Sequence, residues 1–344
     1  MSKRHSVLVT GAGGEIGTGL IQRLSNENAF DIIGLDLKGL DPELAGLCTS
    51  SYTGDVLDTD LVPRLFLDHQ IEAVFHLAAM LSSSGERNPE RAFDVNVGGT
   101  MNLLKNAAEQ ARYLEANIRF IFPSTIAVYG LPDLSTKKRA AKVRENDFLN
   151  PITMYGVNKL SCEHLGYYYT HHYSALSEKR SQWHVDFRAL RFPGLISAHT
   201  LPSGGTSDYI PEMLYAAVAG KPYTCFARPD TRIPLMTMPD AVESILRIFS
   251  APFESLGRTV YNVGAFAPSA EEVENLLTEV LSGADISYEV NESRQAFLDT
   301  WPEDVDDSAA QADWGHAPQH KFKEAFAEYL IPALTGTQTE PTHL

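Results

Sequence analysis

The chain has 344 residues, 44% of them hydrophobic, and its 28 Lys and Arg against 44 Asp and Glu give a formal net charge of −16. A chain of this length forms one large domain or two interlocked domains, with a core that needs no disulfide or metal to hold it together. Its acidity opposes general binding to nucleic acid or to anionic lipid, because clustered Lys and Arg drive such binding.

The cysteines and the apolar segments indicate the compartment. Cys48, Cys162 and Cys225 form neither a CxxC pair nor an even set, which is typical of a reducing environment. The sequence begins MSKRHSVLVTG, without the apolar stretch and cleavage site of a secretory leader. No run approaches the roughly 18 apolar residues of a membrane helix. We therefore expect a soluble, cytoplasmic protein.

Short apolar segments alternate with amphipathic segments through the first half of the chain. Strands buried on both faces of a parallel sheet have this composition, and we expect them at 7–10, 32–36, 73–77 and 120–124. Apolar residues at helical spacing predict helices at 16–24, 61–68 and 93–111. The alternation predicts an α/β fold with a doubly wound parallel sheet, whose ligands bind beyond the carboxyl ends of the strands.

The second half of the chain is less regular. We expect strands at 188–195, 260–263 and 286–290, and helices at 210–219 and 269–281. The last of these begins with a Ser followed by two acids, which is typical of a helix start. We expect a smaller α/β portion from this half.

The chain therefore divides into three parts. Residues 1–195 form the cofactor domain and carry the catalytic residues, and 196–334 form mainly a substrate-binding domain, with some segments returning to the sheet. Residues 335–344 have no apolar periodicity and are expected to be a disordered tail.

A basic run lies between turn-rich segments and contains Lys137, Lys138, Arg139, Lys142 and Arg144. Charge runs usually face water, so we interpret it as a solvated surface loop. Contact with a partner or a phosphate is the alternative.

A glycine pattern follows the first expected strand. Thr10 to Gly17 reads TGAGGEIG, and Gly11, Gly14 and Gly17 stand three residues apart where a helix is expected to begin. Without side chains the backbone can approach a pyrophosphate, whose charge the helix N-terminus attracts. This context predicts a dinucleotide site.

Asp36 ends the second expected strand, about 20 residues beyond the glycines. A carboxylate there can bond an adenosine ribose and repels a 2′-phosphate, which favours NAD over NADP. Lys38, two positions on, is the counter-argument, and we interpret it as an exposed turn lysine.

Tyr155 and Lys159 in MYGVNKL are four residues apart, so both lie on one face of a helix. A free tyrosine has a pKa of about 10, and lowering it by three units requires about 4 kcal/mol of preference for the phenolate. The Lys159 ammonium and an oxidised nicotinamide can supply that preference together. Tyr155 would then take a hydroxyl proton as a hydride leaves the same carbon for the ring.

Two hydroxyls follow the apolar segment that precedes this helix. Ser124 and Thr125 lie at the carboxyl end of an expected strand, where doubly wound folds place their chemistry. One of them can hold a substrate oxygen by a hydrogen bond. A helix cap or turn is the alternative.

These motifs resemble those of the extended short-chain dehydrogenase/reductases, the NAD-dependent epimerase/dehydratase family. The resemblance rests on TGAGGEIG, LAA at 77–79, Asn96 in the following helix, STIAVYG and YGVNK, and it covers nearly the entire chain. It implies a Rossmann domain that binds NAD, with Thr125, Tyr155 and Lys159 at the catalytic positions. Thr125 stands where many members have serine.

The resemblance also implies which residues contact the cofactor. They are Gly11, Gly14, Glu15, Ile16, Gly17, Asp36, Asp55, Val56, Leu77, Ala78, Ala79, Asn96, Ser124, Tyr155, Lys159, Pro193 and Ile196.

Several longer segments resemble one branch of the family, the short-chain L-threonine 3-dehydrogenases. They include LSSSGE at 81–86, RFPGLIS at 191–197, LPSGGTSDY at 201–209 and the long segment at 293–315. The resemblance implies oxidation of the secondary alcohol of L-threonine to 2-amino-3-oxobutyrate, with Tyr155 as general base.

The implied substrate pocket is lined by Ser82, Thr125, Tyr155, Gly194, Thr206 and Trp301. Asp208 lies close enough in sequence to contribute, and a loop-structuring role fits it equally well. For Trp301, plain core packing is the alternative.

Two other functions stay open. A sugar-nucleotide epimerase or dehydratase needs a basic, roomy cleft, and 200–232 offers only Lys221, Arg228 and Arg232. A non-catalytic NAD-binding regulatory protein would not need the intact Thr125, Tyr155 and Lys159.

His164, His171 and His172 share a helical segment, but their spacing does not assemble the ligands that zinc requires, so we expect no metal. The family resemblance suggests a homodimer through the helices at 93–111 and 155–173. A small-molecule substrate is the other expected partner.

Overall fold

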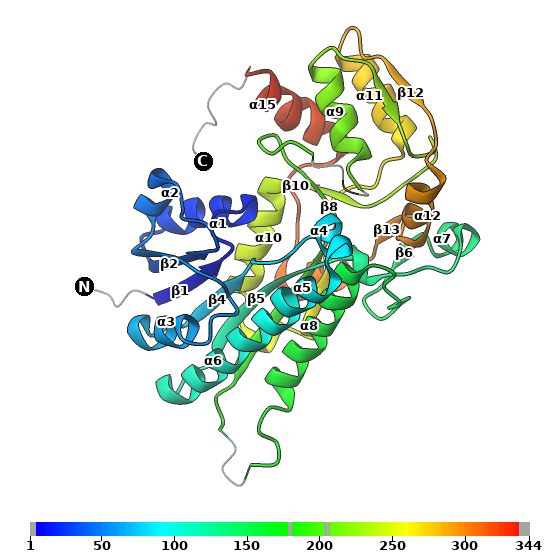
Figure 1. Cartoon of the computed structure of the whole chain (residues 1–344). Helices are drawn as coiled ribbons and strands as arrows, with labels where there is room; N and C mark the ends of the chain where they lie inside the picture. The colour runs from blue at the N-terminus through cyan, green and yellow to red at the C-terminus, as the bar shows by residue number, and fades with distance from the viewer. Residues whose placement is uncertain (1–4, 178–180, 203–204, 206, 337–344) are drawn as a thin grey trace.

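The computed structural model describes residues 5–177, 181–202, 205 and 207–336. At its centre is a parallel seven-stranded sheet in the order β11-β7-β5-β4-β1-β2-β3. Figure 1 shows helices on the faces of this sheet and a smaller lobe of helices and short strands beyond it. The predicted α/β fold with a doubly wound parallel sheet is confirmed.

The strands of the sheet are short and mostly apolar, as their composition predicts. They are β1 (His5–Thr10), β2 (Phe30–Asp36), β3 (Ser50–Thr53), β4 (Ala73–His76), β5 (Ile118–Thr125), β7 (Val185–Phe192) and β11 (Val260–Asn262). β3 was not expected, because its sequence SSYT is too polar to stand out.

Two layers of helices cover the sheet. One face carries α1 (Glu15–Asn26), α2 (Pro42–Leu47) and α10 (Met238–Ser250), and the other carries α3 (Leu61–His69), α6 (Gly99–Leu114) and α8 (Met154–His171). Each layer buries its own apolar core against the strands, as expected for a sheet whose two faces are both covered.

The expected long helix at 93–111 is interrupted. The short α5 (Pro89–Phe93) leads into a π-helical turn, Asp94–Gly98, before α6 begins. A π turn adds a residue to the helical repeat and changes which side chains face inward. Phe93 is therefore 48% exposed, whereas Val97 and Leu104 are buried.

The expected strand at 188–195 is two strands. β7 ends at Phe192, and after Pro193 the short β8 (Gly194–Ile196) leaves the main sheet and pairs with β10 (Leu235–Thr237). Proline has no N–H to donate, so it is a natural point for this separation.

The smaller lobe is built mainly from the second half of the chain. Its helices are α9 (Tyr209–Val218), α11 (Ala270–Val280), α12 (Glu292–Thr300), α14 (Phe322–Glu324), the π-helical Ala325–Leu330 and α15 (Ile331–Thr335). β9 (Tyr223–Cys225) pairs with β12 (Ile286–Tyr288). The expected capping box is present, with Ser269 and Glu272 each bonding the other's backbone.

Each half of the chain contributes segments to the part built mainly from the other half. The core of the smaller lobe includes Tyr129, Leu131 and Val143, while α10, β11 and α13 (Ser308–Trp314) pack on the main sheet. The division at 195 stays a prediction. The expected tail starts inside the described structure, since Thr335 ends α15, and its residues 337–344 lie outside it.

The interpretation of the basic run as a solvated loop is confirmed for the exposure of Lys138, Arg139, Lys142 and Arg144, and is wrong for Lys137 and for the loop conformation. Residues 134–140 form helix α7 (Leu134–Ala140), and Lys137 is 1% exposed. Its Nζ donates to the carbonyls of Arg232 (2.9 Å) and Leu298 (2.8 Å), and burial lowers its pKa to about 8.

Three of the other basic residues in this segment, Lys138, Lys142 and Arg144, form ion pairs with acids. β6 (Lys142–Val143) pairs with β13 (Asp304–Val305), and ion pairs join Lys142 to Asp304 (3.0 Å) and Lys138 to Asp230 (3.0 Å). The segment therefore fastens α7 to α12 and β13.

Within the described ranges, no helix has both the length and the apolar character needed to cross a bilayer.

We expect Lys137→Ala to lower the free energy of unfolding by about 2–4 kcal/mol, because two buried carbonyls lose their donor and a cavity remains. Urea denaturation measures the loss. Lys138→Ala, which breaks an exposed ion pair one residue away, is the control and should cost less than about 1 kcal/mol. Equal losses in the two variants would contradict the role given to Lys137.

Candidate functional site

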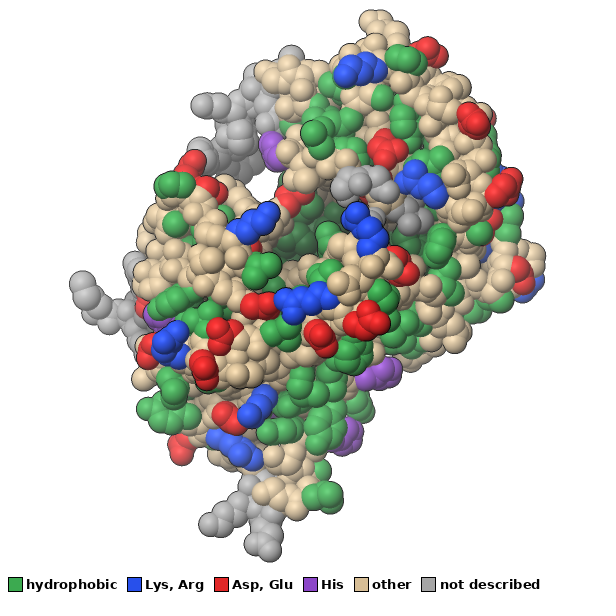
Figure 2. Space-filling model, in the orientation of Figure 1, with side chains coloured by type: hydrophobic (Ala, Val, Ile, Leu, Met, Phe, Trp, Pro, Cys, Tyr) green, Lys and Arg blue, Asp and Glu red, His purple; other side chains and the backbone are tan. Residues whose placement is uncertain are grey.

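A cavity of about 940 Å³ lies at the carboxyl end of the parallel sheet. Its wall is formed by the β1–α1 turn, the ends of β2, β4, β5 and β7, the start of α8, and residues of the smaller lobe. Figure 2 shows a hollow near the middle of the face, with basic and acidic side chains around its rim. The cavity thus lies at the edge of the sheet where the sequence predicts ligands to bind.

The glycine turn allows contacts that no side chain would permit. Gly11 has φ +67°, and a Cβ added to it would lie 2.7 Å from the Ala78 nitrogen. A Cβ on Gly17 would lie 2.5 Å from the Gly11 carbonyl oxygen. The backbone therefore forms a bare cradle that ends in the N-terminus of α1, which suits a pyrophosphate. Gly14, Glu15 and Ile16 complete this part of the wall.

Asp36 is held at the rim of the cradle. Its Oδ2 accepts from the Gly13 N–H (2.9 Å) and its Oδ1 from the Lys38 N–H (3.0 Å). Lys38 itself is exposed and is not on the cavity wall, in line with its interpretation as a turn lysine.

Asp55 and Val56 also line the cavity, together with Arg91, which sequence reasoning missed. Asp55 Oδ1 accepts from the Leu57 N–H (3.0 Å), while Oδ2 forms an ion pair with Arg91 (2.7 Å). Arg91 comes from α5, so it joins that helix to the loop after β3.

Leu77, Ala78 and Ala79 lie on the wall, whereas Asn96 lies behind it. Both ends of the Asn96 amide bond the Met80 backbone, with Oδ1 accepting from N (2.7 Å) and Nδ2 donating to O (3.0 Å). Asn96 therefore fixes the strand end that the cofactor is expected to contact.

A buried histidine supports the same strand end and has no counterpart in the sequence prediction. His76 lies between the Thr10 hydroxyl (2.8 Å) and the Thr100 hydroxyl (3.0 Å), and Thr10 also accepts from the Ala78 N–H (3.3 Å). Burial, assisted by the charge of Lys159, lowers the pKa of His76 to about 3. The ring is therefore neutral and links β1, β4 and α6.

Tyr155 and Lys159 lie on the cavity wall from the start of α8. Thr153 begins this helix by accepting from the Gly156 N–H (3.1 Å). Lys159 Nζ donates to the Pro123 carbonyl (2.7 Å) and lies 5.7 Å from the centre of the Tyr155 ring. The ammonium is thus fixed below the phenol.

Burial controls the ionisation of this pair. It lowers the pKa of Lys159 to about 8 and raises the pKa of Tyr155 above its ordinary value. The phenol is therefore protonated in the protein alone, and Lys159 does not make it a base unaided.

Ser124 and Thr125 both line the cavity and both make local hydrogen bonds. Thr125 Oγ1 accepts from the Ala127 N–H (3.1 Å), which caps the turn after β5, and Ser124 Oγ donates to Glu163 (2.5 Å). Thr125 therefore both caps this turn and lines the cavity.

Several residues that the family resemblance places at the cofactor or in the substrate pocket also line the cavity. Pro193 and Gly194 lie on the wall, while Ile196 is fully buried in the core of the smaller lobe. Ser82, Asp208 and Trp301 are also on the wall, whereas Thr206 lies outside the described residues.

Two of these side chains present polar groups. Asp208 accepts from the Gly205 N–H (2.7 Å), so it structures its loop as well as facing the site. Trp301 is 6% exposed, and its indole N–H has no partner among the described residues.

In the described ranges no cluster of His, Cys, Asp and Glu could hold a metal ion.

The model of the NAD dependent epimerase/dehydratase family matches residues 7–264 of this chain. The chain belongs to this family. Mitochondrial L-threonine 3-dehydrogenase of Bos taurus is 34% identical over 91% of this chain and 78% of its own length.

Two solved structures extend the likeness to the fold. The holo form of a GalE-like L-threonine dehydrogenase from Cupriavidus necator is 31% identical, with a TM-score of 0.81 over 97% of this chain and 100% of its own. A monomeric L-threonine 3-dehydrogenase from a metagenome, in its apo form, is 35% identical, with a TM-score of 0.81 over 96% and 100% of the two chains.

We expect Gly17→Ala to weaken NADH binding at least tenfold, or by about 1.4 kcal/mol, because the new methyl group would overlap the Gly11 carbonyl and force the cradle open. NADH fluorescence titration measures the affinity. Gly46→Ala, in α2 where the methyl group meets open space, is the control and should leave it unchanged. Unchanged affinity in Gly17→Ala would contradict the assignment of the cradle.

Proposed function

We propose that the protein oxidises the secondary alcohol of L-threonine to 2-amino-3-oxobutyrate, with NAD as the hydride acceptor and Tyr155 as the general base. The observation that carries this proposal is the meeting of Tyr155, Lys159 and Thr125 with the glycine cradle on one cavity wall. The family and its threonine dehydrogenase members support the coarser statement: the chain is an NAD-dependent oxidoreductase that acts on CH–OH groups.

The residues present fit the cofactor. Gly11 and Gly17 leave room for its pyrophosphate, and Asp36 stands at the rim with its carboxylate already oriented by two backbone N–H groups. When bound, NAD supplies the ring that accepts the hydride and, in its oxidised form, a positive charge. Ser124, Pro193 and Gly194 lie on the wall that runs from the cradle to the catalytic pair.

The chain's own groups perform the proton chemistry. The Lys159 ammonium, held by the Pro123 carbonyl, stabilises the phenolate of Tyr155, which accepts the proton of the substrate hydroxyl. Thr125 Oγ1 accepts from the backbone of Ala127, so its own hydrogen remains available for a substrate oxygen.

The substrate end suits a small zwitterion. The Asp208 carboxylate can accept from an ammonium, and the unpaired Trp301 N–H and the Ser82 hydroxyl can donate to a carboxylate. A nucleotide sugar has less support, because neither Arg228 nor Arg232 lines the cavity. Arg87 and Arg91 do line it, and Arg91 is paired with Asp55. Intact catalytic groups also disfavour a purely regulatory role.

The homodimer remains part of the proposal. Phe93 (48% exposed), Met101 (38%) and Tyr167 (49%) are apolar residues exposed on α5, α6 and α8, which is the surface that the predicted interface would cover. The relative described as monomeric is a reason to measure this chain's own state. A reducing compartment, such as the cytoplasm, is consistent with free thiols at Cys48, Cys162 and Cys225.

We expect Tyr155→Phe to lower the rate of NADH formation from L-threonine at least a thousandfold, since the proton acceptor is lost, while NADH affinity changes little. Absorbance of NADH follows turnover, and fluorescence follows binding. Tyr168→Phe, a half-exposed tyrosine on the same helix, should retain full activity.

Retained turnover in Tyr155→Phe would refute the proposed base. Failure of the unaltered protein to oxidise L-threonine, together with turnover of a nucleotide sugar, would refute the substrate.

We expect the protein to prefer NAD over NADP, because the Asp36 carboxylate repels a 2′-phosphate. Asp36→Ala should lower the ratio of kcat/KM with NAD to kcat/KM with NADP at least tenfold, which corresponds to about 1.4 kcal/mol. The control is Asp41→Ala, which removes the cap of α2 and leaves the cavity wall intact. Equal rates with the two cofactors in the unaltered protein would refute this role of Asp36.

A further inference from the structure

A buried carboxylate beneath the catalytic groups has no part in the proposed reaction. Glu163 lies on α8 one turn after Lys159 and is 3% exposed. Its Oε1 accepts from the Ser124 hydroxyl (2.5 Å) and from Arg191 Nε (2.9 Å), while its Oε2 accepts from Arg191 Nη2 (2.6 Å). One carboxylate thus joins α8 to the ends of β5 and β7.

We propose that Glu163 is a positioning residue, which fixes Ser124 at the end of β5 and supplies the negative charge that keeps Lys159 an ammonium. The inference rests on the proposed function, because it assigns Lys159 the task of stabilising the Tyr155 phenolate. Glu163 does not line the cavity and acts only through these two neighbours.

Stability alone does not account for this carboxylate. Burying an ion pair removes two charges from water, and an apolar pair of similar size is often as stable or more stable. The position of Glu163 relative to the cavity is more informative. At four residues from Lys159, Glu163 shares a face of α8 with the lysine, and its other contact is a hydroxyl on the cavity wall.

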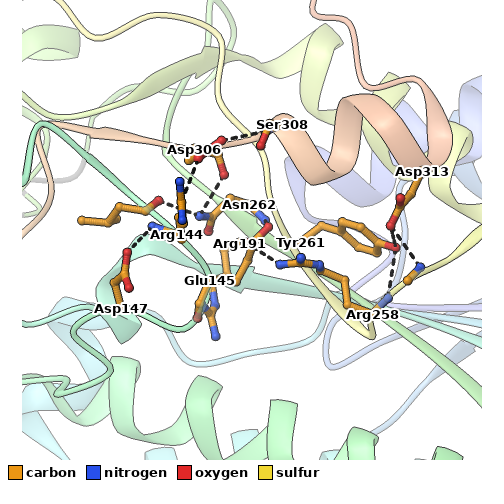
Figure 3. A network of polar contacts seen from close by, with 12 residues as sticks. Arg144, Glu145, Asp147, Arg191, Arg258, Tyr261, Asn262, Asp306, Ser308 and Asp313 are labelled. Carbon is orange, nitrogen blue, oxygen red and sulfur yellow. Dashed lines mark hydrogen bonds and ion pairs between the residues drawn. The ribbon is translucent and has the colours of Figure 1, made fainter.

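Arg191 is itself held in place from the side opposite Glu163. Its Nη1 donates to the Tyr129 hydroxyl (2.9 Å) and to the Glu145 carbonyl (2.5 Å). Figure 3 shows Arg191 beside Glu145, which pairs with Arg258 (2.7 Å) and accepts from the Asn262 N–H (3.2 Å). Because Arg191 is anchored to several elements, it presents a fixed partner to Glu163.

The groups facing Lys159 leave Glu163 as its source of negative charge. On α8 they are Tyr155, Cys162 and Glu163, on β4 the neutral His76, and on β5 the Pro123 carbonyl. Burial raises the pKa of Cys162 to about 11, so it is a neutral thiol at physiological pH. Burial lowers the pKa of Lys159, whereas Cys162 and then Glu163 raise it. On β7, Arg191 is the cation paired with Glu163, and its charge opposes part of the effect of the carboxylate.

Glu163→Gln tests the proposal, because it keeps the shape of the side chain and removes its charge. The unliganded protein, labelled with ¹⁵N-lysine and with Lys159 assigned by comparison with Lys159→Arg, is titrated by NMR. We expect the midpoint of Lys159 to fall by about one pH unit, since an opposite charge has been removed. In threonine oxidation, the alkaline limb of the kcat/KM profile should move to lower pH by the same amount.

Asp186→Asn is the matched control. Asp186 forms a buried, two-hydrogen-bond pair with Arg188 on the same strand β7, and it does not line the cavity. This variant should lower the melting temperature without moving the Lys159 midpoint or the alkaline limb of the kcat/KM profile. Glu163→Asp, which retains the charge, should restore most of the Lys159 midpoint.

Unchanged Lys159 titration in Glu163→Gln, with only a lower melting temperature as in Asp186→Asn, would overturn the proposal. If Glu163→Gln does not fold, Glu163→Gln/Arg191→Gln removes both charges of the pair and leaves no unpaired buried ion. Because loss of the Arg191 cation offsets part of the effect, a smaller fall in the Lys159 midpoint is expected, and the absence of any fall would overturn the proposal. Because the NMR titration uses neither cofactor nor threonine, it is unaffected if the proposed substrate proves wrong.

Discussion

The close packing of α8 against β7 and the turn that follows β5 determines the rest of the site. A Cβ on Gly156 would lie 2.1 Å from the Ala127 carbonyl oxygen, and one on Gly166 would lie 2.2 Å from the Phe187 ring. Only a helix with glycine at both points can approach this closely. The approach brings Lys159 to the Pro123 carbonyl and places Tyr155 on the cavity wall, so the proposed catalytic pair depends on two glycines outside the glycine pattern of the cradle.

The second constraint is the direction of the strands. Because β1, β2, β4, β5 and β7 are parallel, the glycine cradle, Asp36 and the hydroxyls of Ser124 and Thr125 all emerge at one edge of the sheet. Hydrogen bonds below that edge keep these loops in place, through His76 at the end of β4 and through Glu163 of α8, which accepts from Ser124 at the end of β5. The site is thus a set of loop residues whose positions are determined by buried polar groups underneath.

Sequence reasoning located what local spacing encodes. The cradle, Asp36 and the Tyr155–Lys159 pair each depend on residues close together in the chain, so their patterns are readable. Glu163 with Arg191 and Lys137 with Leu298 are 28 and 161 residues apart, and nothing in their own segments indicates the partner. The same limit explains why a run of lysines was interpreted as a solvated loop: composition does not show which member the fold buries.

Local groups at the cradle explain how so acidic a chain can receive an anionic cofactor. Gly11 and Gly17 leave room for a pyrophosphate next to the N-terminus of α1, which carries a partial positive charge. Lys159 lies on the same cavity wall, and the Pro123 carbonyl solvates its ammonium without cancelling the charge. The net charge of −16 therefore does not by itself oppose binding of an anionic dinucleotide, because the contacts at the cradle are local.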